Sequence, residues 1–189
     1  MEADWELELG PDAAGLAAPV IDAAWAGFVD LRSEPERAWE LPEAALLPSL
    51  AETLIKLNAI DSPVWTSKCD FWPSLEAGEF DPDEMDAPPG CAAHAMGCYI
   101  DLLPKNDMQW ELPEKVAEAC RQICGFLHDL ALGCCRADFV IRRVFIASNS
   151  DCLGVTAYLT SCGDSPAGAA KTLQTALESL PGAFGAAQR

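Results

Sequence analysis

Residues 138–161 read DFVIRRVFIASNSDCLGVTAYLTS, and the prediction of the fold starts from this stretch. Its runs Asp138–Ala147 and Cys152–Ser161 are rich in the β-branched and aromatic residues that favour strands. Between them lies the short polar segment Ser148–Asp151. Two strand-like runs joined by so short a polar gap predict a hairpin.

Segments in which apolar residues recur at helical spacing lie on both sides of this hairpin. Ser165 is the expected N-cap of the helix that follows it, and Ser49 of an earlier helix in which Glu52 completes a capping box. The predicted helices cover 19–31, 49–58, 114–132 and 165–180. Two further runs are rich in strand formers, and they predict strands at 64–72 and 97–103.

The order of these elements predicts the fold class. Helices precede, interrupt and follow the strands, and regular alternation of strand and helix is absent. We therefore expect an α+β two-layer sandwich, in which helices pack on a small, mainly antiparallel sheet of about four strands. Residues 14–182 form this single domain, residues 1–13 an acidic N-terminal arm or short edge strand, and residues 183–189 a flexible tail.

The charge of the chain is strongly negative and unevenly distributed. The formal net charge is -18, and residues 1–90 hold 20 acids and 4 bases, whereas residues 91–189 hold 10 acids and 8 bases. The first half therefore has a net charge of -16 and the second half of -2. A surface of this sign excludes direct nucleic-acid binding through phosphates and adsorption to anionic lipid.

The cysteines and the hydropathy pattern predict the compartment. The chain has nine cysteines, an odd number, in apolar or strand-like stretches rather than in the loop-rich framework of secreted disulfide proteins. No run of eighteen apolar residues predicts a membrane span, and the acidic start is unlike a signal peptide. We expect a cytoplasmic protein with reduced and mostly buried thiols.

A run of acidic residues in a proline-rich loop, residues 76–89, is the densest concentration of charge. It contains Glu76, Glu79, Asp81, Asp83, Glu84 and Asp86. Such a run is either a solvated loop or a surface that attracts a basic protein partner through its long-range field. A calcium-binding loop is excluded because the glycine and the downstream glutamate that an EF-hand needs are missing.

Aromatic residues lie next to this run. Trp65 and Trp72 are an odd number of residues apart, so a regular strand would direct them to opposite faces of the sheet. One of the two is then exposed beside the acidic loop, and aromatic residues of this kind are frequent in interface hot spots. We assign Trp72, together with the six acidic residues, to the predicted partner-binding surface.

Cys91, His94 and Cys98 have the spacing C-x2-H-x3-C, which places three possible zinc ligands close together in sequence. Cys69 is a possible fourth ligand from a neighbouring strand. The alternative is that these residues are small buried side chains of the core. A cysteine nucleophile activated by histidine is the corresponding enzymatic hypothesis, although no cysteine lies in a recognisable catalytic motif.

Two classes of function remain. The first is a cytoplasmic interaction protein without catalytic activity, of the inhibitor, immunity or nucleic-acid-mimic type, that binds a basic protein and needs no cofactor. The second is a small metal- or thiol-dependent enzyme that uses the Cys91, His94 and Cys98 cluster. The chain has no phosphate-binding glycine loop and no nucleophile elbow. The charge asymmetry and this lack of catalytic motifs favour the first class.

Overall fold

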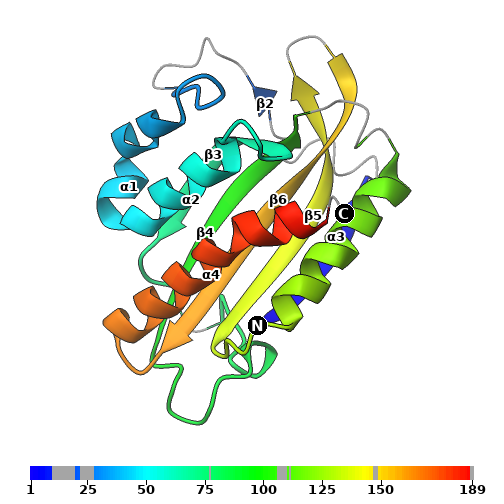
Figure 1. Cartoon of the computed structure of the whole chain (residues 1–189). Coiled ribbons are helices and arrows are strands. Elements are labelled where there is room, and N and C mark those ends of the chain that lie inside the picture. The colour runs from blue at the N-terminus through cyan, green and yellow to red at the C-terminus, as the bar shows by residue number, and fades with distance from the viewer. Residues whose placement is uncertain are drawn as a thin grey trace.

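The computed structural model of this chain describes residues 1–9, 20–21, 28–76, 78–105, 110, 112–146 and 149–187. These residues form one sheet with helices packed against it, so the predicted α+β two-layer architecture is confirmed (Figure 1).

Five strands of the described sheet follow the spatial order β1-β5-β6-β4-β3. Neighbouring strands are antiparallel except for β1 and β5, which run parallel. The two-residue strand β2, Val20–Ile21, lies off this order and also pairs with β5. The strand bounds are Glu2–Glu8 for β1, Val64–Trp72 for β3, His94–Pro104 for β4, Cys135–Ile146 for β5 and Asn149–Gly163 for β6. All four predicted strands are present, and β1 and the two-residue β2 are additional.

β1 forms one edge of the sheet, in the region predicted as an arm or edge strand. Its residues alternate, because Ala3 packs in the core while Asp4 and Glu6 are exposed. The backbone N–H of Ala3 donates a hydrogen bond of 3.1 Å to Nε2 of His128, which ends α3. This contact joins the strand to a helix 125 residues away in sequence.

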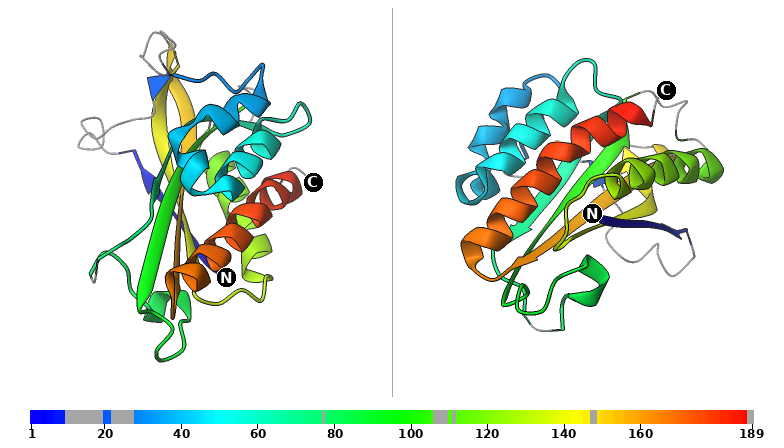
Figure 2. Two further views of the ribbon diagram at one scale, coloured as in Figure 1. Left: turned by 90° about the vertical axis from the view of Figure 1, so that its left-hand side faces the viewer. Right: turned by 60° about the horizontal axis from the view of Figure 1, so that its bottom comes forward.

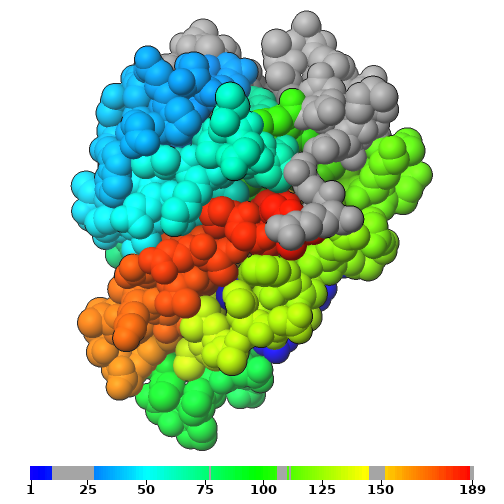
Figure 3. Space-filling view, in the orientation of Figure 1, coloured from blue at the N-terminus to red at the C-terminus, as the bar shows by residue number. Residues whose placement is uncertain are grey.

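The helices α2, α3 and α4 all lie on one side of the sheet, as the edge-on view shows (Figure 2). On that side they cover the strands almost completely (Figure 3). Short helical turns η2 and α1 precede α2, and η3 lies in the acidic loop. The bounds are Pro35–Glu40 for η2, Pro42–Leu46 for α1, Pro48–Asn58 for α2, Asp83–Met85 for η3, Pro113–His128 for α3 and Pro166–Ala186 for α4.

Alternate strand residues and one stripe of each helix make up the main core. From the central strands, Phe139, Ile141 and Leu159 are fully buried. α3 contributes Val116, Cys120, Ile123 and Leu127, the stripe that its apolar spacing predicts. α4 begins as predicted, since the Ser165 hydroxyl accepts a hydrogen bond from the backbone N–H of Gly168 at 3.2 Å.

The predicted helix over residues 19–31 is wrong wherever the structure describes it. Val20–Ile21 form strand β2, and residues 28–31 are not helical. The other residues of that segment, including Trp25, lie outside the described residues. The apolar residues of this segment have helical spacing, which predicted a helix. Val20 and Ile21 are instead extended beside β5, a conformation that β-branched residues favour.

The observed bounds of three predicted helices also differ from the predicted ones. α2 begins at Pro48, because proline fits the first turn of a helix. Ser49 is therefore not the N-cap, and its hydroxyl is buried without a described hydrogen-bond partner. α3 ends at His128, four residues before the predicted end. α4 continues through Pro181 to Ala186, where the sequence predicts a flexible tail, because Phe184 is buried against Phe139, with ring centroids 6.2 Å apart.

Trp65 and Trp72 lie on the same face of the sheet, contrary to the prediction from their odd spacing. Trp65 is opposite Leu103 and Trp72 opposite Gly97, and these two β4 residues share one face. The register shifts between Thr66 and Cys69, where β3 has one extra residue. This bulge reverses the side-chain alternation beyond it, so both indoles point away from the helices.

The α3 stripe gives the first testable prediction. Ile123 is 1% exposed, so Ile123→Ala should lower the free energy of unfolding by about 2–5 kcal/mol because it leaves a cavity in the core. Ile60 is 99% exposed, and Ile60→Ala is the matched control that should change stability by less than about 0.5 kcal/mol. Urea unfolding followed by circular dichroism measures both. Equal effects of the two substitutions would show that this face of α3 is not in the core.

Candidate partner-binding surface

The face of the sheet opposite the helices, called the outer face from here on, has no helix over it among the residues that the structure describes (Figure 2). Apolar clusters cover its two ends. At one end Trp65, Leu103 and Val144 pack with Phe28. At the other end Met85 of the acidic loop packs with side chains of β4 and β6. Between these ends the outer face is only partly open, because Val140, Asp101 and Thr156 are buried while Trp72, Tyr99 and Tyr158 are half-buried.

A row of aromatic side chains crosses this open part. Tyr99 of β4 is opposite Tyr158 of β6, and their ring centroids are 5.9 Å apart. Trp72 at the end of β3 lies 5.8 Å from Tyr99. Burial, followed by the charges of Asp101 and Asp70, raises the pKa of Tyr99 to about 12, so this phenol stays protonated and can donate a hydrogen bond.

Acidic residues surround the aromatic row, and the arginines of this face are paired with them. Arg136 contacts Asp138 at 2.8 Å and Glu84 at 3.4 Å. Arg142 contacts Glu8 at 2.8 Å and also donates a hydrogen bond to the hydroxyl of Tyr158. The solvent-accessible carboxylates of the outer face further include Asp4, Glu6 and Asp70. The surface is therefore negative overall, and its arginines already have acidic partners.

The acidic loop crosses one end of the outer face. Met85, 1% exposed, anchors the loop against Ala95 and Cys162, and the backbone N–H of Leu75 bonds to the carbonyl of Ala95 at 3.0 Å. Its six carboxylate residues, Glu76, Glu79, Asp81, Asp83, Glu84 and Asp86, are all exposed. A buried methionine thus fixes the loop while its charges face solvent.

The loop connects the two sides of the candidate surface. Glu79 lines a cavity with Trp72 of β3, whereas Glu84 pairs with Arg136 of β5. β3 and β5 are three strand spacings apart, about 14 Å. The structure therefore brings Glu79 to Trp72 and holds Glu84 on the far side of the outer face. Local turns shape the loop, since the Asp81 carboxylate accepts a hydrogen bond from the N–H of Asp83 at 2.9 Å.

The predicted zinc ligands do not come together. Cys98 is fully buried in the core on the helix side, whereas His94 is exposed at the start of the same strand. Four extended residues separate their backbones by about 13 Å, much more than the roughly 4 Å between ligands of one zinc ion. Cys91 lies in the loop before β4, and Cys69 is opposite Ile100. Among the described residues, no three histidine, cysteine or acidic side chains form a metal-binding group.

The thiols are also poorly suited to nucleophilic catalysis. None of the nine cysteines forms a disulfide. Burial raises the pKa of Cys69 and of Cys120 to about 12, and it raises the pKa of Cys98 further. A nucleophilic cysteine needs a lowered pKa, so these side chains behave as small core residues.

Sequence reasoning missed Tyr99, Tyr158 and the two arginines of the outer face. The available signal was the two-residue alternation in β5 and β6, which places Asp138, Arg142 and Tyr158 opposite the apolar core positions. The cross-strand neighbours could not be read from one sequence, because they depend on how the strands pair.

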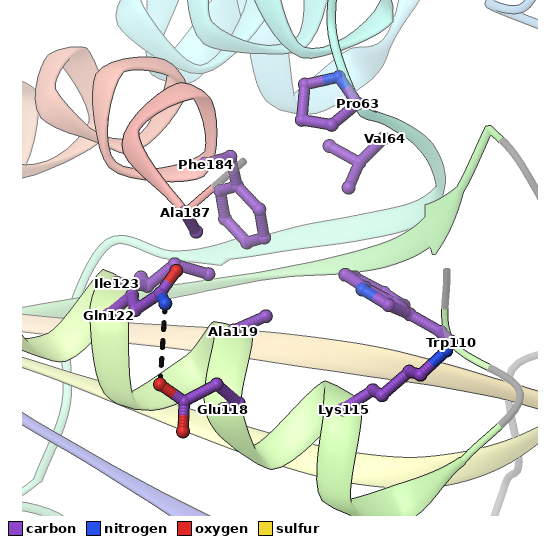
Figure 4. A pocket seen from close by; sticks show the side chains of 10 residues that line it. All are labelled: Pro63, Val64, Trp110, Lys115, Glu118, Ala119, Gln122, Ile123, Phe184 and Ala187. Atoms are coloured by element: carbon purple, nitrogen blue, oxygen red, sulfur yellow. Dashed lines mark hydrogen bonds between the residues drawn. The ribbon is translucent and has the colours of Figure 1, made fainter. Parts of the chain in front are cut away.

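A second cavity, of about 270 Å³, lies in the helical layer between α3 and the end of α4 (Figure 4). Phe184, Ile123 and Val64 give it an apolar wall. Glu118 and Gln122 contact each other at 3.4 Å, so these polar groups are not directed together at a ligand. This cavity shows no combination of charged or reactive groups that would indicate a site.

Comparison with protein-family models, curated proteins and solved structures finds no match to this chain. Within the described residues, none of the helices has the length and apolar character needed to span a bilayer.

The environments of the cysteines predict their reactivity. Cys98, Cys120, Cys124, Cys135 and Cys162 are buried, while Cys69, Cys91, Cys134 and Cys152 are half-buried. A thiol reagent at neutral pH should modify at most the four half-buried residues in the native protein, and all nine after denaturation. Mass spectrometry counts the adducts. Rapid native labelling of the buried group would contradict the strand registers described above.

Asp101 gives a prediction about pH. It is 5% exposed and accepts a hydrogen bond of 2.6 Å from the Thr156 hydroxyl. Burial raises the pKa of its carboxyl above the ordinary value of 3.8. Its contribution to stability is therefore fully present below that ordinary value and is lost as the pH rises through the raised pKa.

Asp101→Asn keeps an acceptor for Thr156 and removes the buried charge. At pH 7 this variant should be as stable as the wild type or more stable, and the difference should vanish below pH 3.8. Denaturant titrations across this pH range test it, with the exposed Asp61→Asn as control. A loss above about 1 kcal/mol at pH 7 would mean that the charge itself stabilises the fold.

Proposed function

We propose that this chain is a cytoplasmic interaction protein without catalytic activity, which binds a basic protein through its outer face and acidic loop. The observation that supports the proposal most strongly is the helix-free sheet face on which an aromatic row and a surplus of carboxylates meet. Aromatic residues supply binding energy at protein interfaces, while complementary charge accelerates association and selects the partner.

The distribution of charge between the two layers supports this orientation of binding. The acidic β1, the acidic loop and the carboxylates of β3 and β4 border the outer face, whereas Arg136 and Arg142 on it are already paired with acidic groups. An incoming basic surface would relieve the repulsion among the remaining carboxylates. Inhibitors, immunity proteins and nucleic-acid mimics use such surfaces, because the basic sites that they block are built to bind phosphate.

The lack of disulfides among the nine cysteines and the raised thiol pKa values support a reducing compartment over a thiol-dependent mechanism. The separation of His94 from Cys98 argues against the metal-dependent alternative. The cytoplasmic assignment and the binding role are thus mutually consistent.

Neutralising the loop tests the proposal. In the loop variant, Asp81, Asp83 and Asp86 become asparagine and Glu84 becomes glutamine. A basic partner is first captured from the source cell with the wild-type protein and identified. Its association rate with the loop variant should then fall about tenfold at low salt, and its dependence on salt should flatten. The fold should persist, because these residues are exposed and an exposed ion pair such as Glu84–Arg136 contributes little.

A matched control removes the same amount of charge from the helical layer. Glu36, Glu52, Glu114 and Glu178 are exposed residues of η2, α2, α3 and α4, and in the helix variant all four become glutamine. This variant should associate within about twofold of the wild-type rate, since the partner docks on the opposite side. If both variants associate equally slowly, the net charge of the protein alone explains the effect. If the loop variant associates at the wild-type rate, the acidic loop is not part of the interface.

A further inference from the structure

A cavity of about 320 Å³ lies on the outer face beside the acidic loop. Gly97 lines it, opposite Trp72 on β3 and Thr160 on β6. A Cβ atom at this position would lie 3.2 Å from Cε3 of Trp72 and 3.3 Å from Cδ1 of Leu75. Because Gly97 has no side chain, Trp72 and Leu75 lie close to its backbone and line the cavity on β4.

The side chains that line this cavity combine aromatic rings with a carboxylate. Trp72 and Tyr158 supply the rings, and Glu79 of the acidic loop supplies the carboxylate. The position of Glu79 is fixed by the loop, because one of its carboxylate oxygens accepts a hydrogen bond from the N–H of Glu76 at 2.6 Å. Rings and a carboxylate in one cavity favour a cation with a flat, apolar surface.

The same face already binds a guanidinium group in this way. Arg142 places its guanidinium carbon 5.7 Å from the centroid of the Tyr158 ring. Its Nε donates a hydrogen bond of 2.8 Å to Glu8, and Nη1 donates one of 3.0 Å to the Tyr158 hydroxyl. A tyrosine ring and a glutamate thus hold an arginine within the chain, and the cavity places the same Tyr158, together with Trp72, beside a second glutamate, Glu79.

We propose that the cavity at Gly97 receives an arginine side chain of the basic partner, with its guanidinium against Trp72 and Tyr158 and hydrogen-bonded to Glu79. This inference rests on the proposed function, since it names the anchor through which the basic protein is recognised. Arginine fits better than lysine, because its planar group stacks on aromatic rings, is less strongly hydrated and bonds a carboxylate through two N–H groups.

Fluorescein-labelled hexa-arginine and hexa-lysine peptides test the attraction of the acidic surface for a basic partner separately from the arginine site in the cavity. The two peptides have equal charge and differ in the group that enters the cavity. At low salt both peptides should bind the wild-type protein through the acidic surface, and hexa-arginine should bind about fivefold more tightly. Trp72→Leu and Glu79→Gln should each bring this ratio close to one. Trp39→Leu and Glu52→Gln alter exposed residues of η2 and α2 and should leave the ratio unchanged.

A spectroscopic readout locates the contact. The indole N–H resonance that is absent from the spectrum of Trp72→Leu belongs to Trp72, and in the wild-type protein it should shift with hexa-arginine more than with hexa-lysine. Thermal unfolding of each variant verifies that the fold is kept.

The outcomes distinguish the inference from the function on which it rests. If both peptides bind but Trp72→Leu keeps the wild-type preference for arginine, the cavity is not the anchor and the inference is overturned while the proposed function stands. If neither peptide binds at low salt, the acidic surface does not attract a basic partner, and both proposals are rejected.

Discussion

Burial of the helix-facing side of the β5, β6 and β4 strands constrains the rest of this molecule. Phe139, Ile141 and Leu159 point under the helices and have no exposed surface. The alternate residues must then point the other way, because side chains along a strand change face at every step. Asp138, Arg142 and Tyr158 occupy these alternate positions, so the alternation that fills the core also supplies the outer face.

The same constraint places part of the charge of the first ninety residues around the outer face. β1 extends the sheet at β5, and its alternate acidic residues follow the outer face. The acidic loop leaves β3 at Trp72 and returns into β4 at His94, both on the sheet, so it has to cross the sheet end. Met85 fixes this crossing by burial, and it leaves the carboxylates exposed. Ion pairs of Arg136 with Glu84 and of Arg142 with Glu8 connect the acidic loop and β1 to β5.

Much of the fold could be predicted from local patterns. β3 has the bounds that its composition predicts, and the β5–β6 hairpin and the Ser165 cap follow from short-range signals. The bulge after Thr66 has no such signal, and it moved Trp72 to the face shared with Trp65. The pairing of β1 with β5 joins segments more than a hundred residues apart, so only its alternating residues hinted at it. For the candidate surface, sequence could predict an acidic loop next to Trp72, but Tyr99, Tyr158 and the Gly97 hollow require knowledge of the strand registers.

The proposed basic partner covers the outer face and leaves the helical layer exposed. Carbodiimide labelling of carboxyl groups, with and without the bound partner, distinguishes the two sides of the protein because both have exposed acids. Glu79, Asp83 and Glu6 should be protected by the partner, whereas the labelling of Glu52 and Glu178 on α2 and α4 should not change. Protection of the helix acids with free labelling of the loop would show that the partner binds the helical layer instead.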